Sequence, residues 1–171
     1  MATYDDGTVF DDLRLERRRA GLPMRSAMRH VRYRLRDGRG EAEPEAIGGP
    51  AIELQQVHPA RIGRGRARVC WGAGIGGRGE LFECTHRVDL DSGAVATWRR
   101  ADATQLEPLF VPRPGGADDD DGVLFVPTLA DADETTVIGV LDARTMDCLA
   151  ELRTPQIVPF GFHAAFRPAP A

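Results

Sequence analysis

VDLDSGAVATW, residues 88–98, and VLDARTMDCLA, residues 140–150, share one pattern. Each begins as an apolar strand, reaches an aspartate, passes through a short turn and continues as a second strand. Asp91 and Asp142 occupy matching places in the two stretches, 51 residues apart. A β-hairpin that returns after about fifty residues is typical of a β-propeller blade. The sequence therefore predicts an all-β chain built from blade-like units.

The sequence around these two stretches also predicts short strands separated by turns. The chain contains 19 glycines and 12 prolines, which favour turns over long helices. Periodicity predicts strands at 29–36, 66–71, 81–90, 94–99, 107–112, 122–128, 135–142 and 147–153. Residues 11–20 predict the single short helix, which Gly21 and Pro23 end.

The length of the chain limits how many blades it can form. Its 171 residues suffice for one domain with a hydrophobic core, but for only three or four blades of about 40–50 residues. A propeller closes on itself to cover its edge strands. The chain is therefore either a smaller open sheet or part of a larger propeller. Residues 1–7 read as the middle of a loop, which favours the second alternative.

Composition and charge are those of an ordinary globular protein, with 42% hydrophobic residues, 28% charged residues and a net charge of −4. Arginines crowd residues 13–40, but those at 32 and 34 alternate with apolar Val31, Tyr33 and Leu35. This period of two predicts a strand with one solvated face, and no aromatic platform for bases accompanies it. We expect no nucleic-acid binding.

The cysteines and the N-terminal residues indicate a reducing compartment. Cys70, Cys84 and Cys148 are odd in number and form no CxxC pair, so we expect three free thiols. The first twenty residues contain no apolar signal-peptide core, and no apolar run approaches the roughly 20 residues of a membrane helix. The sequence predicts a cytoplasmic chain without a transmembrane segment.

Two glycine or acidic motifs are better explained as turns. Gly72, Gly74 and Gly77 have dinucleotide-binding spacing, but a strand follows them where a phosphate-binding helix is needed. The aspartates at 118–121 precede Gly122 as in a calcium loop, yet Ala and Thr then occupy the terminal ligand positions. We expect a glycine-rich hairpin loop and an acidic turn.

Other candidate sites are equally weak on residue pattern alone. Cys84 and His86 share a strand face with apolar neighbours and lack a second ligand pair, so we expect core residues rather than zinc ligands. Ser26 and Ser92 lack the setting of a nucleophilic serine. His163 lies in the apolar segment VPFGFH, where a lone histidine is typically a buried structural residue.

A family resemblance changes the interpretation of His163. The segments EPLFVPRPGG at Glu107–Gly116 and FGFHAAF at Phe160–Phe166 closely resemble the closing motifs of the carotenoid cleavage oxygenases, the retinal pigment epithelial membrane protein-like family. Weaker similarity extends over residues 11–15, 51–57 and 86–98 in the same order. The resemblance covers nearly the whole chain.

The resemblance implies a fold, a cofactor and site residues. Such enzymes are seven-bladed propellers that hold Fe(II) with four histidines and use O₂ to cleave a double bond of a carotenoid, apocarotenoid or stilbene-like polyene. Residues 1–171 would be the C-terminal portion, about three blades with a short N-terminal helical excursion, and the N-terminal blades would be absent. His163 would be the fourth iron ligand. Glu53 and Glu107 would be the carboxylates that orient ligand imidazoles.

The chain also departs from the family pattern. The other three ligand histidines belong to family segments before residue 1, and His30, His58 and His86 do not replace them. Ala164 replaces the glycine that usually follows the last histidine, and Gln55, Gln56 and His58 differ from the usual residues after Glu53. Three interpretations stay open: part of an iron dioxygenase that requires its missing N-terminal portion, a non-catalytic β-rich remnant without metal, and a binding module that kept a polyene cleft.

Overall fold

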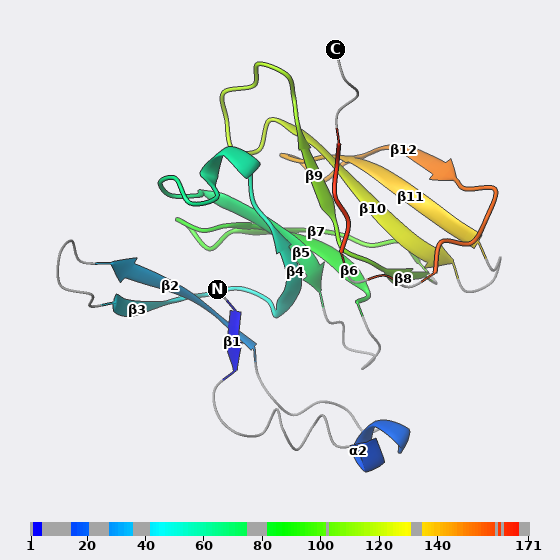
Figure 1. The fold of residues 1–171 in the computed structure, drawn as a ribbon, viewed down its shortest axis with the longest axis horizontal. Helices are drawn as coiled ribbons and strands as arrows, with labels where there is room; N and C mark the ends of the chain where they lie inside the picture. Colours follow the sequence, from blue (N-terminus) through cyan, green and yellow to red (C-terminus); the bar gives the residue numbers. More distant parts are fainter. Residues whose placement is uncertain are drawn as a thin grey trace. The chain divides into compact units, whose positions relative to one another are not determined.

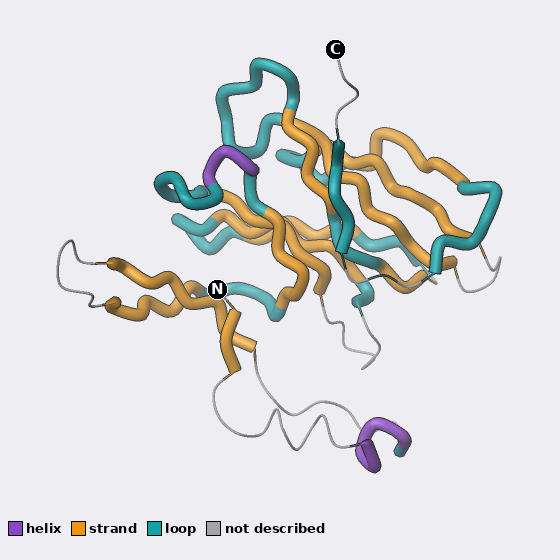
Figure 2. Tube along the Cα trace, viewed as in Figure 1, coloured by secondary structure: helices purple, strands orange, loops and turns teal. Residues whose placement is uncertain are grey.

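The structure is a computed structural model that describes residues 2–4, 15–20, 28–35, 42–74, 82–101, 103–130, 135–159, 161 and 163–167. The chain divides into two compact units, residues 1–51 and residues 52–171. Strands make up nearly all the regular structure of the described residues, as predicted (Figure 2). The two helical segments among them are α2, Leu15–Arg19, and the 3₁₀ turn η1, Pro59–Arg61.

The first unit contains a three-stranded antiparallel sheet, ordered β1-β2-β3. Its strands are β1 (Ala2–Tyr4), β2 (Met28–Leu35) and β3 (Ala42–Ile47). The arginine-rich stretch is therefore the strand that its alternation predicts. Pro44 pairs with Tyr33 on the edge strand, where a missing N–H is tolerated. Helix α2 falls within the predicted helix, whose first four residues lie outside the described residues.

The second unit begins with a four-stranded antiparallel sheet in sequential order (Figure 1). Its strands are β4 (Ile52–Gln56), β5 (Val69–Gly74), β6 (Cys84–Asp89) and β7 (Val95–Trp98). Gly72 and Gly74 lie within β5, which pairs with β6. Gly72 and Gly74 thus lie in a strand and not in the predicted hairpin loop, and β6 is the next described element, because residues 75–81, with Gly77 among them, lie outside the described residues.

A five-stranded antiparallel sheet completes the second unit. Its strands are β8 (Ala103–Gln105), β9 (Leu109–Pro112), β10 (Gly122–Ala130), β11 (Thr135–Asp142) and β12 (Cys148–Arg153). Strands β8 and β9 both pair with β10, one at each end of it. Strands β8 and β9 therefore act as one interrupted partner strand of β10, and residues 106–108 are the interruption.

The repeated hairpin exists, but the predicted correspondence of Asp91 with Asp142 is wrong. Asp142 Oδ1 accepts hydrogen bonds from the N–H groups two and three residues later, and Asp89 Oδ1 does the same in the first hairpin. Gly93 and Met146 follow in matching positions with φ of 73° and 66°. Asp89 is therefore the equivalent of Asp142, because the turn needs a carboxylate at its first residue.

The two sheets of the second unit pack through a shared apolar core. Val69 and Trp71 of β5 belong to a cluster with Leu124 of β10 and Leu141 of β11, all fully buried. Trp71 stacks on Phe110 with ring centroids 4.4 Å apart. Its Nε1–H donates to the carbonyl of Ala143 at 2.9 Å, which satisfies the buried indole. This packing fixes β9 relative to the four-stranded sheet of β4 to β7.

Buried aspartates join the same two sheets. The predicted acidic turn at 118–121 leads into β10, and two of its carboxylates point inward. Asp119 accepts from the Arg61 side chain at 2.6 Å and from the Arg68 backbone at 2.9 Å. Asp120 accepts from Arg87 of β6 at 2.6 Å. The acidic turn therefore has a structural role, because its ion pairs connect the two sheets.

The cysteines are free, as predicted. Cys70 and Cys84 are buried and Cys148 is exposed on β12. Cys84 Sγ lies 3.2 Å from His86 Nε2, and the other ring nitrogen of His86 lies 2.8 Å from Thr97 Oγ1. Burial, aided by Arg99, lowers the pKa of His86 and favours the neutral ring. Cys84, His86 and Thr97 thus form a chain of side-chain contacts in which both ring nitrogens of His86 have a partner.

Candidate functional site

Glu107 lies in the interruption between β8 and β9. The side chain is buried, with the residue only 5% exposed, although carboxylates are rarely buried without partners. The preceding residue, Leu106, still donates its backbone N–H to the carbonyl of Pro127 on β10 at 2.9 Å, and the pairing resumes at Leu109. The break in pairing turns the Glu107 side chain toward segments that are distant in sequence.

Three groups from two other segments meet this carboxylate. Gln56 Nε2, at the end of β4, donates to Oε1 at 2.9 Å. The backbone N–H of Ala164 donates to Oε2 at 2.5 Å. His163 Nδ1 lies 3.4 Å from Oε1. A buried carboxylate is stabilised when donors replace its lost water, and this one has contacts on both oxygens.

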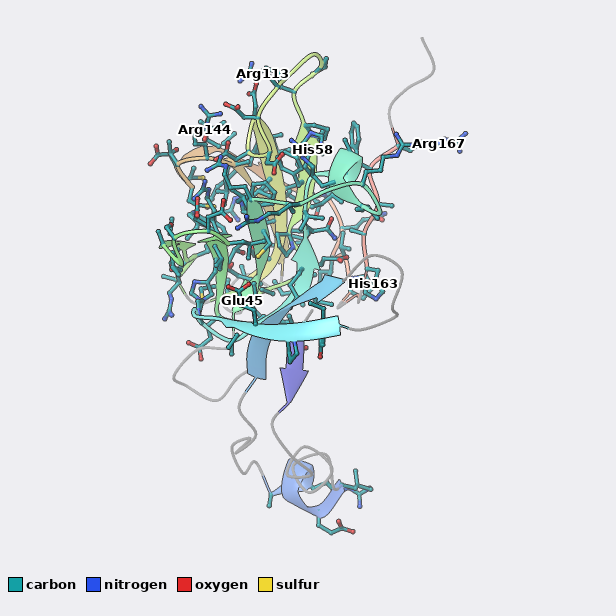
Figure 3. All side chains as sticks on the ribbon, turned by 90° about the vertical axis from the view of Figure 1, so that its left-hand side faces the viewer. Glu45, His58, Arg113, Arg144, His163 and Arg167 are labelled. Carbon is teal, nitrogen blue, oxygen red and sulfur yellow. The ribbon has the colours of Figure 1, made fainter. Side chains whose placement is uncertain are left out.

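His163 is exposed on its other side. Its side chain is 77% exposed, whereas that of Glu107 is 7% exposed. Figure 3 shows the ring projecting outward from the ribbon. Because Nδ1 faces the carboxylate, Nε2 is the nitrogen through which this ring would ligate a metal ion. A carboxylate behind an imidazole is the usual support of a metal-ligating histidine, so His163 fits the role of one ligand.

The structure brings two of the three predicted site residues together. Glu107 and His163 are in contact, although 56 residues separate them. Glu53 lies half-buried in β4, the strand that also supplies Gln56, and pairs with Ala73. Its role toward a second imidazole stays a prediction. Gln56 was noted in the sequence only as a departure from the family pattern, and nothing in its residue type marked it as a partner of Glu107.

The other histidines that the structure describes with side chains have their own contacts. The His58 ring packs against Phe110 at 5.5 Å, and its Nδ1 accepts from the Ala60 N–H at 3.1 Å. His86 belongs to the Cys84 chain. No group of three or more His, Cys, Asp or Glu side chains is placed to hold a metal within the described ranges. His163 is thus a candidate for one ligand of a larger set.

An apolar pocket of about 530 Å³ borders this site. Its lining comes from the end of β4, from η1, from β9 and the turn after it, and from the C-terminal segment, which runs beside β9 (Figure 1). The lining residues are Gln56, Pro59, Leu109, Phe110, Pro112, Pro114, Ala164, Ala165 and Phe166. Gln56 and Ala164 therefore contribute both to the pocket and to the Glu107 contacts.

Residues 1–168 match the family of the retinal pigment epithelial membrane protein. The chain belongs to this family, the carotenoid cleavage oxygenases. Carotenoid cleavage dioxygenase 8 homolog A of Oryza sativa subsp. japonica, a chloroplastic protein by name, is 31% identical over 97% of the chain and 31% of its own length. The torulene dioxygenase of Fusarium fujikuroi is 32% identical over 72% of the chain and 22% of its own length. The human mitochondrial carotenoid-cleaving dioxygenase is 31% identical over 72% and 21%.

Solved structures confirm the predicted fold. The apocarotenoid oxygenase of Synechocystis, in a form with one substitution, matches 81% of the chain and 30% of its own chain with a TM-score of 0.72 and 24% identity. Its cobalt-substituted form matches with a TM-score of 0.71. The sheets of this chain therefore have the fold of part of a β-propeller. The chain spans less than a third of the length of these relatives.

No helix in the part of the chain that the structure describes has the length and apolar character needed to cross a membrane. The names of some relatives place them in chloroplasts or mitochondria. The cytoplasmic location of this chain stays a prediction.

Proposed function

We propose that residues 1–171 form the C-terminal portion of an Fe(II)-dependent dioxygenase that cleaves a double bond of a carotenoid, apocarotenoid or stilbene-like polyene with O₂. The observation that carries this proposal is the contact between His163 Nδ1 and the buried Glu107 carboxylate. Membership of the family and the dioxygenase names of the relatives support the reaction class.

His163 would bind iron through Nε2. Glu107 would accept a hydrogen bond from Nδ1–H, which selects the tautomer that leaves the Nε2 lone pair free to ligate and makes the ring a stronger ligand. Glu53 would support a ligand imidazole from the N-terminal portion in the same way. When bound, iron supplies the activation of O₂ that no amino-acid side chain can provide.

The pocket beside the site suits an apolar substrate. Its walls are largely prolines and the rings of Phe110 and Phe166, which exclude water without offering charges. Apolar walls with few polar groups are typical of sites for hydrophobic ligands. This lining supports a polyene as the substrate class.

The proposal is tested by producing the chain together with the product of the upstream coding region. Iron content and loss of polyene absorbance under O₂ are measured. The assembled protein should retain iron and bleach the polyene, and His163→Ala should abolish both. Glu107→Gln should weaken both by about ten- to a hundredfold, the usual effect of a residue that supports a metal ligand.

His58→Ala is the matched control, because His58 contacts Phe110 and the η1 backbone rather than Glu107. It should leave iron content unchanged. If His163→Ala keeps both iron and turnover, His163 is not the ligand. An assembled protein that binds a polyene without iron or turnover would instead identify a binding module.

A further inference from the structure

Gln56 contacts Glu107, a contact that could not be predicted from its position in the sequence. It is the last residue of β4, and the register of β4 against β5 shifts between Glu53 and Gln56. Leu54, inside this irregularity, has a φ of 53°, which a leucine rarely adopts. The shift leaves Gln56 opposite Trp71 and half-buried, with its amide beside Glu107.

The adjacent Gln55 shows that this placement is specific. Its Nε2 donates to the Ile52 carbonyl in its own strand at 2.9 Å, and the residue is exposed. Two identical side chains therefore follow one another in the chain with different partners. Only the second crosses to a residue 51 positions away.

The donors around Glu107 restrict how its carboxylate can turn. Gln56 and His163 both face Oε1, and each carboxylate oxygen has two lone pairs, so Oε1 accommodates both. The Ala164 N–H holds Oε2 at 2.5 Å. The His163 contact is the longest of the three, at 3.4 Å. The stronger contacts therefore set the plane of the carboxylate, and the imidazole responds to it.

We propose that Gln56 is a positioning residue that holds Oε1 of Glu107 toward Nδ1 of His163 and thereby fixes the tautomer of the His163 ring. The Gln56 amide is a neutral donor, so it orients the Glu107 carboxylate and leaves its negative charge uncompensated. A lysine or arginine at the same position would compensate that charge. The consequence for iron rests on the proposed function. The effect on the ring is independent of it.

The test uses ring ¹⁵N chemical shifts of His163 in the 171-residue chain without metal. The neutral ring of the unsubstituted chain should carry its proton mainly on Nδ1. Gln56→Leu removes the donor that orients Oε1, so the carboxylate can turn and part of the proton population should move to Nε2. Gln55→Leu is the matched control and should leave the His163 shifts unchanged.

A second variant covers the case in which leucine disturbs the fold. Gln56→Glu preserves the size of the side chain, removes the donor and places a carboxylate against Glu107, so it should shift the tautomer as well. In the unsubstituted chain, the Gln56 side-chain amide should be protected from hydrogen exchange, and Glu107→Ala should abolish this protection. An unprotected amide, or a folded Gln56 variant with unchanged His163 shifts, would overturn the proposal.

Iron retention in the assembled protein distinguishes the positioning role of Gln56 from the proposed iron-dependent function. Gln56→Leu should reduce retention severalfold, less than Glu107→Gln, because it acts through Glu107. A tautomer shift in a protein that never holds iron would preserve the positioning role and refute the proposed function.

Discussion

Asp89 and Asp142 form the same turn in two successive sheets. Each carboxylate accepts backbone N–H groups of the next residues at 2.9–3.1 Å, and each turn then passes through a residue with positive φ, Gly93 or Met146. The backbone N–H of Asp89 also donates to Ala94, and that of Asp142 to Asp147. The backbone of each aspartate therefore closes its hairpin, while the carboxylate accepts the N–H groups inside the turn.

Asp89→Asn should weaken the chain at neutral pH but not at low pH. The hydrogen bond from the Ser92 backbone, together with Arg68, lowers the pKa of Asp89. A carboxyl with a lowered folded-state pKa contributes stability above its unfolded value of about 3.9, and this is lost as pH falls through the folded-state pKa. Asparagine keeps an acceptor but loses the charge, so we expect a cost of about 1 kcal/mol at pH 7.

Urea unfolding at pH 7 and at pH 3 measures this difference, which should shrink at the lower pH. Asp91→Asn is the control, because Asp91 is exposed and forms a surface ion pair with Arg66. It should cost about 0.5 kcal/mol or less. A larger loss for Asp91 than for Asp89 would restore the correspondence that the sequence predicted.

Asp120→Asn should be among the most damaging single substitutions. Asp120 is 2% exposed and pairs with Arg87, whose side chain is 13% exposed, at 2.6 Å. Burial alone would raise the pKa of Asp120, but Arg87, Arg144 and Arg68 lower it overall. Removing one partner of a buried pair leaves the other charge uncompensated, which costs about 3–5 kcal/mol.

The neighbouring Asp121 provides the control for this substitution. It pairs with Arg113 at 2.8 Å, but that arginine side chain is 67% exposed, so Asp121→Asn should cost less than about 1 kcal/mol. Adding Arg87→Met to Asp120→Asn should recover part of the loss, because it removes the orphaned charge. Equal free energies of unfolding for the two asparagine variants would contradict the buried-pair argument.

The three thiols should react at different rates. Cys148 is exposed and should react with a thiol reagent in the native chain, whereas Cys70 and Cys84 should react only on unfolding. Burial raises the pKa of Cys70 to about 11, so its reactive thiolate is scarce at pH 8. Titration without reductant should find one fast thiol natively and three in denaturant. A single thiol in denaturant would indicate a disulfide.

Residue patterns predicted the strands best where one face is regularly buried. Strand β11 has the predicted bounds, and β10 extends only two residues past its prediction, because buried and half-buried positions alternate along it. Strand β5 begins three residues later than predicted, since all six of its residues are buried and no alternation marks its ends. Strand β4 was missed: it is short, polar and irregular at Leu54.

The site shows the same limit. Glu107 and His163 became candidates through the family motifs, because no periodicity links residues 56 positions apart. The Gln56 contact depends on the register shift in β4, a backbone feature that residue type does not encode. Family similarity thus made Glu53, Glu107 and His163 candidates, whereas the contact of Gln56 with Glu107 follows only from the backbone geometry.

The isolated chain should self-associate through the five-stranded sheet. One face of β10 packs on the sheet of strands β4 to β7, while the residues of the other face are apolar and only partly buried. On β10 and β11 they are Val123, Phe125, Pro127, Leu129, Ile138 and Val140. Leu152 of the edge strand β12 pairs with Ile138 and is 48% exposed. Extended apolar faces and unpaired edge strands favour association.

Leu152→Glu should therefore shift the chain toward monomer, because a carboxylate cannot be buried between two apolar faces without a partner. Sedimentation velocity over a range of micromolar concentrations measures the change. Ile62→Glu is the control, since Ile62 is 68% exposed in the loop after η1, is not part of the five-stranded sheet and should leave association unchanged. A chain that is monomeric at every concentration and melts in one sharp transition would show that this apolar face needs no partner.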